Sequence, residues 1–327
     1  MLHTLQALPE TQAQDQIYDL YSGPTTATGY DPVRDRDELL EFLSAIVRFR
    51  DTCCLHGGIE IQVQGYGNSL LLANFVPHMA QGVGVPAQFL PACKVLCDDR
   101  QIPVPLTDLE MDELLEEDLW TNFYHFFSTG YNPSAIKRRI YIHCNGVESS
   151  LHVMSVCCGF LDHPSCRGLE AIKVAGPGCG GRLDTIVVYL TDDNAVKGFL
   201  DLYQLMHLPT SYLASGVPIG VKEVKTGIGI ADEPPDIGLL DRISFEGVNE
   251  ADRLQNREQQ SFGSFLAKLM VIAMKNAGDE TQFLSNLIQL FHIAHIDPAN
   301  PHVHAGRRVL EFLNKQGMSA KWARRDK

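Results

Sequence analysis

The sequence predicts an α+β fold, a mostly antiparallel sheet packed by helices, in a single large domain with a helical C-terminal part. Short β-branched runs bounded by glycine alternate with a helical segment in the middle of the chain, and two apolar stripes at helical spacing follow. The 327 residues, 45% hydrophobic and 20% charged, have the composition of a globular protein. We expect an N-terminal α/β-containing region, residues 1–110, to be integrated with a core over 111–327.

Residues 1–130, before the predicted core strands, predict two helices and a strand. Residues 35–50 place apolar side chains at helical spacing, with acids in the first turn and arginines in the last. Apolar and polar residues alternate over 59–63, which indicates a strand. Residues 108–130 are acidic and then aromatic, and predict a helix that ends near Gly130.

The middle of the chain predicts the strands of the core sheet and two helices, at 148–163 and 194–206. Residues 218–235 are rich in glycine, proline and lysine, and predict a loop with a short extended piece. Residues 236–260 are charged and weakly periodic, as in a surface insertion. The three predicted strands are 138–144, 169–176 and 182–193.

The C-terminal part predicts two further helices, whose apolar stripes over 262–273 and 283–294 close the core. Two prolines in "HIDPANPHVH" end the second helix. The basic end of the chain, "KWARRDK", is expected to be a solvated terminus.

Charge and cysteine content restrict the function classes. With 27 basic and 40 acidic residues, the net charge of −13 disfavours nucleic acid as a partner. The chain has neither a signal-peptide pattern nor 18 uninterrupted apolar residues, so we expect a cytoplasmic protein without a membrane partner. Nine cysteines, an odd number, are expected to be reduced, and Cys93 with Cys97 forms only a weak zinc pattern.

The strand "RRIYIHC" carries an unusual set of polar side chains. Because side chains alternate along a strand, Arg139, Tyr141 and His143 are expected on a polar face, opposite a buried face with Ile140 and Ile142. Tyrosine and histidine can each carry a proton. This strand therefore offers a cation and two proton carriers on one face.

The next two predicted strands add Lys173, and Arg182 with Asp184. If the three strands are neighbours, these side chains form a compact cluster that suits a phosphorylated or carboxylated ligand. Nearby arginines would lower the pKa of Lys173 and make its amine usable as a base. The alternative is that Arg182 and Asp184 form an ion pair at a strand edge while Lys173 is merely exposed.

The glycine-rich segment "VKEVKTGIGIADEP" adds Lys222 and Lys225 before a turn whose free backbone N–H groups could face an anion. The sequence contains neither the phosphate-binding loop of nucleoside triphosphatases nor a G-x-G-x-x-G motif after a strand. Nucleotide binding is therefore unsupported. His302 and His304 form an H-x-H pair, a spacing that seldom binds metal.

Several short motifs resemble, in the same order, the Hop-A-type type III effector family, over roughly residues 120–304. Members of that family also occur as stand-alone or fused lyases in lanthipeptide and thioamitide biosynthesis. The motifs are "RRIYI", "IKVAG" leading to "GRLDTIVVYLTDD", "GVKEVKTGIGIADEP", "QSFGSF" and "HIDPANPHVH".

The resemblance implies elimination of phosphate from phosphoserine or phosphothreonine in a precursor peptide, after a partner kinase has acted. Dehydroalanine or dehydrobutyrine is the product. Lys173 is then the base, Arg139, Arg182 and Lys222 bind the phosphate, and Tyr141 is a candidate for the acid. His143 is a second candidate for the acid, on the separate ground that it shares a strand face with Tyr141. Asp184, Gly227 and Gly229 are supporting residues, with Ala231 in the same turn. No cofactor or metal is expected, and secretion by a type III system stays open.

Two departures from the family pattern keep an alternative open. About 25 residues separate "ADEPP" from "QSFGSF", where a short link is expected, and the "SFG" stretch lacks an arginine shortly afterwards. The alternative is a non-catalytic, effector-like or peptide-binding protein that retains the fold. A phosphate-dependent hydrolase is a third hypothesis.

Overall fold

The computed structural model describes residues 2–23, 42, 53–55, 60–64, 69–71, 123–179, 181–233, 262–294 and 296–304. The chain divides into two compact units. The sheet unit comprises residues 23–217 and 223–229, and the helical unit comprises 1–22, 218–222 and 230–327. The expected boundary near residue 110 lies outside the described residues and stays a prediction.

One sheet contains nine of the described strands, in the order β3-β2-β1-β4-β6-β7-β5-β9-β8. All of the pairings β1–β2, β2–β3, β1–β4, β4–β6, β6–β7 and β5–β7 are antiparallel, which confirms the predicted α+β class. The strands are β1 Cys53–Leu55, β2 Glu60–Gln64, β3 Ser69–Leu71, β4 Phe123–Phe127, β5 Arg138–Ile142, β6 Leu169–Ala175, β7 Ile186–Leu190, β8 Lys222–Lys225 and β9 Ile228–Asp232.

The three predicted core strands form β5, β6 and β7, and they are neighbours in the sheet. Ile140, Ile172 and Val188 are paired across them and completely buried, as their β-branched side chains favour. The face that carries Arg139, Tyr141 and Lys173 is polar, as predicted. It is not exposed to solvent, because all three side chains are buried. Both faces of these central strands are therefore covered.

Residues 123–127 form strand β4, which corrects the predicted helix over 108–130. The run "FYHFF" pairs with β6 at five successive positions, from Phe123 opposite Ala175 to Phe127 opposite Ala171. Aromatic side chains fit a pleated, buried surface well, and this pairing outweighs the local helical preference of the acidic residues before it. Residues 108–122 lie outside the described residues.

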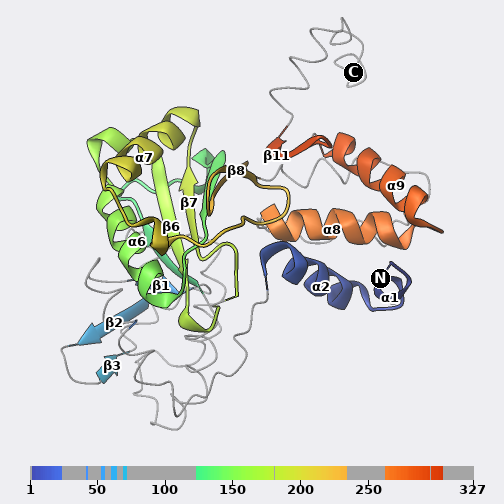
Figure 1. Cartoon of the computed structure of the whole chain (residues 1–327), viewed down its shortest axis with the longest axis horizontal. Helices are drawn as coiled ribbons and strands as arrows, with labels where there is room; N and C mark the ends of the chain where they lie inside the picture. Colours follow the sequence, from blue (N-terminus) through green and yellow to red (C-terminus); the bar gives the residue numbers. More distant parts are fainter. Residues whose placement is uncertain are drawn as a thin grey trace, which may run out of the picture. The chain divides into compact units, whose positions relative to one another are not determined.

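Two helices pack on the sheet beside β5 and β6 (Figure 1). They are α6 Val147–Phe160 and α7 Asp193–Leu205, and both confirm predicted helices. Asp192 caps α7 by accepting hydrogen bonds from the N–H groups of Asn194 and Ala195, which sets where the helix begins. Single 3₁₀ turns lie at Pro133–Ala135, Pro164–Cys166, Pro177–Cys179 and Thr210–Tyr212.

The glycine-rich segment forms a hairpin, β8 and β9, where a loop with a short extended piece is predicted. Gly227 lies in its two-residue turn, while Gly229 and Ala231 belong to β9 rather than to the turn. The N–H of Gly227 donates to Oε1 of Glu223 at 3.1 Å. This N–H is therefore engaged within the hairpin and is not open to an anion, contrary to the prediction.

In the helical unit, two N-terminal helices pack on α8, and α8 packs on α9 (Figure 1). Its core joins Ala13 and Ile17 to Ala267, Val271 and Met274. The apolar stripes predicted α8 and α9 correctly, whereas the two N-terminal helices were not predicted. The elements are α1 Leu2–Gln6, α2 Glu10–Ser22, α8 Phe262–Lys275 and α9 Glu280–Ile293, with the hairpin β10 Ile296–Asp297 and β11 Asn300–His304.

Several predictions concern residues beyond those described. Of the predicted helix 35–50, only Phe42 is described; it is helical and its ring packs edge-on against Tyr124. The insertion 236–260, the basic terminus and the Cys93–Cys97 pair lie outside the described residues. Within the described segments, no helix is long and apolar enough to cross a membrane. The buried cysteines Cys144, Cys157, Cys158, Cys166 and Cys179 do not form disulfides.

Gly227→Ala should destabilise the protein. Gly227 has φ +68°, and an added Cβ would lie 2.3 Å from the carbonyl oxygen of Ala214. The backbone conformation alone costs a non-glycine residue about 1–3 kcal/mol. Chemical denaturation should report a loss of at least this size, whereas Gly130→Ala, with no atom within 4 Å of its added Cβ, should unfold like the wild type. Equal stability of the two variants would contradict the strained turn.

Candidate functional site

The candidate site lies on one face of the central strands, around Lys173 of β6. In the register, Lys173 is opposite His125 of β4 on one side and Val187 of β7 on the other. Val187 is in turn opposite Tyr141 of β5. Since neighbouring strands are about 4.8 Å apart, His125 is next to Lys173 and Tyr141 is two strands away.

Arg139 lies on the same face, one row further along the sheet. It is opposite Tyr189 of β7, and its guanidinium carbon is 5.0 Å from the centre of the Tyr189 ring. This stacking holds a buried cation over an aromatic face. The sheet thus orders Arg139, Tyr141 and Lys173 as the alternation pattern predicts.

Arg182 and Asp184 enter the site from the loop before β7. Their assignment to a strand is wrong, since β7 begins only at Ile186. Arg182 donates from Nε and Nη2 to the two carboxylate oxygens of Asp184, at 2.7 and 2.9 Å. The arginine is only 2% exposed. The alternative hypothesis, that Arg182 and Asp184 form an ion pair, is therefore confirmed. The pair lies in a buried loop and not at a strand edge.

Phe123 connects the ion pair to the lysine. The ammonium nitrogen of Lys173 is 3.8 Å from the centre of the Phe123 ring, and the guanidinium carbon of Arg182 is 4.9 Å from the same centre. Lys173 is 7% exposed, so the reading that it is merely exposed is wrong. The fold therefore brings Lys173 and Arg182, with its partner Asp184, to one aromatic ring.

Burial lowers the pKa of Lys173 from 10.5 to about 8. Loss of hydration is the largest cause, because it disfavours the charged amine; the Asp184 carboxylate opposes it, and Arg182 and Arg139 add to it. The predicted direction of the shift is confirmed, but burial rather than crowding by guanidinium groups dominates. A substantial fraction of Lys173 is neutral at slightly alkaline pH.

Four predicted site residues remain: His143, Lys222, Gly227 and Gly229. His143 follows the end of β5, and its Nδ1 is 2.9 Å from the carbonyl oxygen of Ser215, which fixes the ring and places a proton on Nδ1. Lys222 begins β8, is exposed, and belongs to the helical unit. Gly227 and Gly229 support the hairpin as described above. The roles assigned to all of these residues stay predictions.

His125, Phe123 and Tyr189 are residues of this face that the sequence reading missed. His125 and Phe123 fall in a segment that is read as a helix, so no strand face could be assigned to them. The overlooked signal is the aromatic run "FYHFF", which favours a strand. Among the described residues, no group of three or more histidine, cysteine or acidic side chains is arranged to hold a metal ion.

Comparison with known proteins identifies one matching family and several similar structures, among them those of two bacterial effector proteins. The sequence model of the HopA1 effector protein family matches residues 117–303, more than half of the chain. The structure of the effector protein from Pseudomonas syringae pv. syringae strain 61 is 16% identical with a TM-score of 0.50, covering 92% of this chain and 91% of that one. The effector protein from Pseudomonas syringae pv. tomato strain DC3000 is 15% identical with a TM-score of 0.48, covering 92% and 95%. At such identity the first of these structures supports the fold alone, and no curated protein matches.

Lys173→Met should stabilise the protein near neutral pH. The folded-state pKa of about 8 lies below the unfolded value of 10.5, so folding below pH 8 must bury a charge, and this cost disappears as the pH rises through 10.5. The gain from the substitution should be on the order of 3 kcal/mol at about pH 7 and vanish at high pH.

Urea denaturation of both proteins at several pH values measures this difference. Lys197→Met, on an exposed side chain of α7, is the control and should show no such pH-dependent gain. A Lys173→Met gain that is the same at pH 7 and above pH 10.5 would show that Lys173 has an ordinary pKa.

Proposed function

This chain belongs to the HopA1 effector protein family, and on that premise we propose that it is a phosphoserine/phosphothreonine lyase. It would eliminate phosphate from a phosphorylated precursor peptide in lanthipeptide-like biosynthesis, and leave dehydroalanine or dehydrobutyrine. One observation carries the proposal: a buried lysine with a lowered pKa lies on the same face as Arg139 and around the same ring as Arg182. A base beside fixed cations is what this elimination requires.

The proposed step begins at the neutral amine of Lys173, which takes the proton from Cα of the phosphorylated residue. The electron pair of the broken C–H bond forms the Cα=Cβ double bond. The bond from Cβ to the phosphate oxygen breaks, and phosphate leaves with that oxygen and the bonding pair. Lys173 returns to its neutral form by releasing the proton to solvent.

Local charge supports a phosphate ligand in a chain that is acidic overall. Arg139 and Arg182 contribute two guanidinium groups against the single carboxylate of Asp184, so the cluster stays positive when Lys173 is neutral. Guanidinium groups bind phosphate oxygens in a two-point manner, and burial strengthens such contacts. Asp184 holds Arg182 in a fixed orientation. The described geometry gives no support for Lys222 as a third phosphate ligand.

Protonation of the leaving oxygen would assist the reaction. Tyr141, one of the two predicted acids, lies in the same row of the sheet as Lys173. His125 lies in that row too and is closer to Lys173 by register, so we add it to the candidates. His143 is the weaker candidate, because its Nδ1 is engaged with backbone carbonyl groups.

A second candidate function, peptide binding without catalysis, is favoured by the Arg182–Asp184 pair. A buried two-point ion pair with 2.7 and 2.9 Å contacts satisfies much of the hydrogen-bonding capacity of Arg182 within the protein. Such a pair can be purely structural. The two functions are distinguished by the product, because only the lyase removes phosphoric acid from the peptide.

Lys173→Met should abolish elimination from synthetic phosphoserine and phosphothreonine peptides, since the variant lacks the base. Mass spectrometry detects the product as a peptide that has lost phosphoric acid, whereas a hydrolase would restore the hydroxyl. The wild-type kcat/KM should rise with pH and level off above about 8, where Lys173 is neutral. Lys197→Met should retain full activity. Unchanged product formation by Lys173→Met would remove this lysine from the mechanism, and a wild type that binds phosphopeptides without converting them would favour the binding protein.

Arg139→Gln should weaken phosphopeptide binding by about 1.5–3 kcal/mol, the range of a hydrogen bond to a charged group. Calorimetry with matched phosphorylated and unphosphorylated peptides separates the phosphate contribution from the rest. Arg138→Gln is the control, because the neighbouring Arg138 pairs with Asp193 at 2.7 Å and alternates to the other face of β5. If both variants lose the same affinity, Arg139 has no specific contact with phosphate.

A further inference from the structure

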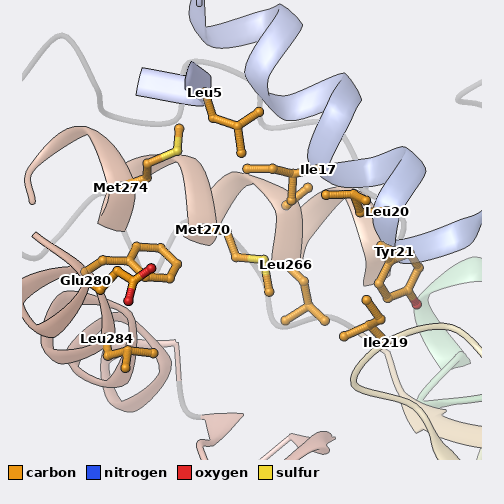
Figure 2. Close-up of a pocket in the computed structure, with 12 residues that line it drawn as sticks. Leu5, Ile17, Leu20, Tyr21, Ile219, Leu266, Met270, Met274, Glu280 and Leu284 are labelled. Atoms are coloured by element: carbon orange, nitrogen blue, oxygen red, sulfur yellow. The ribbon is translucent and has the colours of Figure 1, made fainter. Parts of the chain in front are cut away.

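The helical unit contains an apolar groove, separate in kind from the cationic site. Its hollow measures about 450 Å³ and is formed by α1, α2, α8 and α9 together with Ile219. In Figure 2, Leu266 and Met270 of α8 lie between Leu20 of α2 and Leu284 of α9. We use "apolar groove" for this hollow. Its volume falls in the range of ligand sites, about 300–1,000 Å³.

Large apolar side chains at the groove remain exposed to solvent. Leu20, Ile219 and Leu284 are 56%, 54% and 55% exposed. Ile288, one helical turn after Leu284, is exposed as well and extends the apolar surface along α9 beyond the hollow. Contiguous apolar surface of this kind marks an interaction site more often than chance exposure does. This apolar surface extends along a helix, and it is larger than the area that a compact small molecule covers.

The helices around the groove are acidic. Glu280, at the start of α9, is the one charged side chain among the described residues that line it. The four helices and the Asp279 cap contain five carboxylates against two lysines, Lys268 and Lys275. Lys275 is already paired with Glu10, at 3.4 Å. Positive charge on a ligand near Glu280 would therefore strengthen its binding to this groove, whereas anionic lipids and nucleic acids are disfavoured as ligands.

We propose that the apolar groove binds a short amphipathic helix of a partner protein, with lysine or arginine flanking its apolar face. An amphipathic helix inserts side chains at i, i+3, i+4 and i+7 into a hydrophobic groove, which matches an elongated apolar surface with a hollow. Met270 and Met274 line the hollow, and methionine adapts to differently shaped side chains. The groove has few polar groups to orient a small molecule. This inference does not depend on the proposed lyase function.

Binding can be tested with the full chain and a labelled synthetic helix of about 18 residues, five turns, with leucines on one face and lysines flanking it. Fluorescence anisotropy should show saturable binding, and a scrambled peptide of equal composition should not bind. Leu284→Lys should weaken binding at least tenfold. The matched control is Leu205→Lys on α7, which is 68% exposed in the sheet unit and should bind like the wild type. Circular dichroism checks that each variant is folded.

A charge exchange tests the assigned chemistry. Glu280→Lys should weaken binding of the lysine peptide and strengthen binding of a peptide in which glutamates replace the lysines. Absence of saturable binding, equal binding of both peptides to the wild type, or an unchanged affinity in Leu284→Lys would each overturn the proposal. Self-association of the chain that Leu284→Lys abolishes would overturn it as well, because the occupant would then be a second copy.

Discussion

The burial of Lys173 in the middle of the sheet is the constraint on which the site depends. Strand β6 lies between β4 and β7, and all seven of its residues are buried. Neither face of β6 therefore exposes a charged side chain to solvent. The amine is accommodated by the ring of Phe123 and by the charge of Asp184. Removing the amine from water makes its neutral form accessible near physiological pH. Stability is lost for that reason, and a strained or costly group of this kind is typical of functional sites.

The same contacts explain how the cations coexist. Arg182 would repel Lys173 if both were charged and close, yet Asp184 offsets its charge and Phe123 contacts both. Arg139 is held separately, by the face of Tyr189. Aromatic rings thus replace water around two arginines and a lysine in a buried site. The arrangement suits an anionic ligand that would complete the charge balance.

The two units carry opposite local character within one acidic chain. The sheet unit gathers cations on one face of its central strands, whereas the helical unit presents exposed apolar side chains on helices that carry more carboxylates than lysines. We propose different ligands for these surfaces, a phosphate group in one case and a basic amphipathic helix in the other. Each proposal can be tested separately, with substitutions confined to one unit.

The residue pattern alone was enough to predict the α+β class, the strands β5, β6 and β7, the helices α6 to α9, and the shared face of Arg139, Tyr141 and Lys173. Period-two and helical spacings are local properties, and they suffice for elements and faces. Tertiary packing was needed to show that β4 is a strand opposite β6, that Arg182 and Asp184 pair in a loop, and that both faces of the central strands β5, β6 and β7 are buried. Pairing partners and burial come from segments distant in sequence, so His125 could join Lys173 only once β4 was paired. Local propensity carries no information about such neighbours, and it is outweighed where the packing is strong.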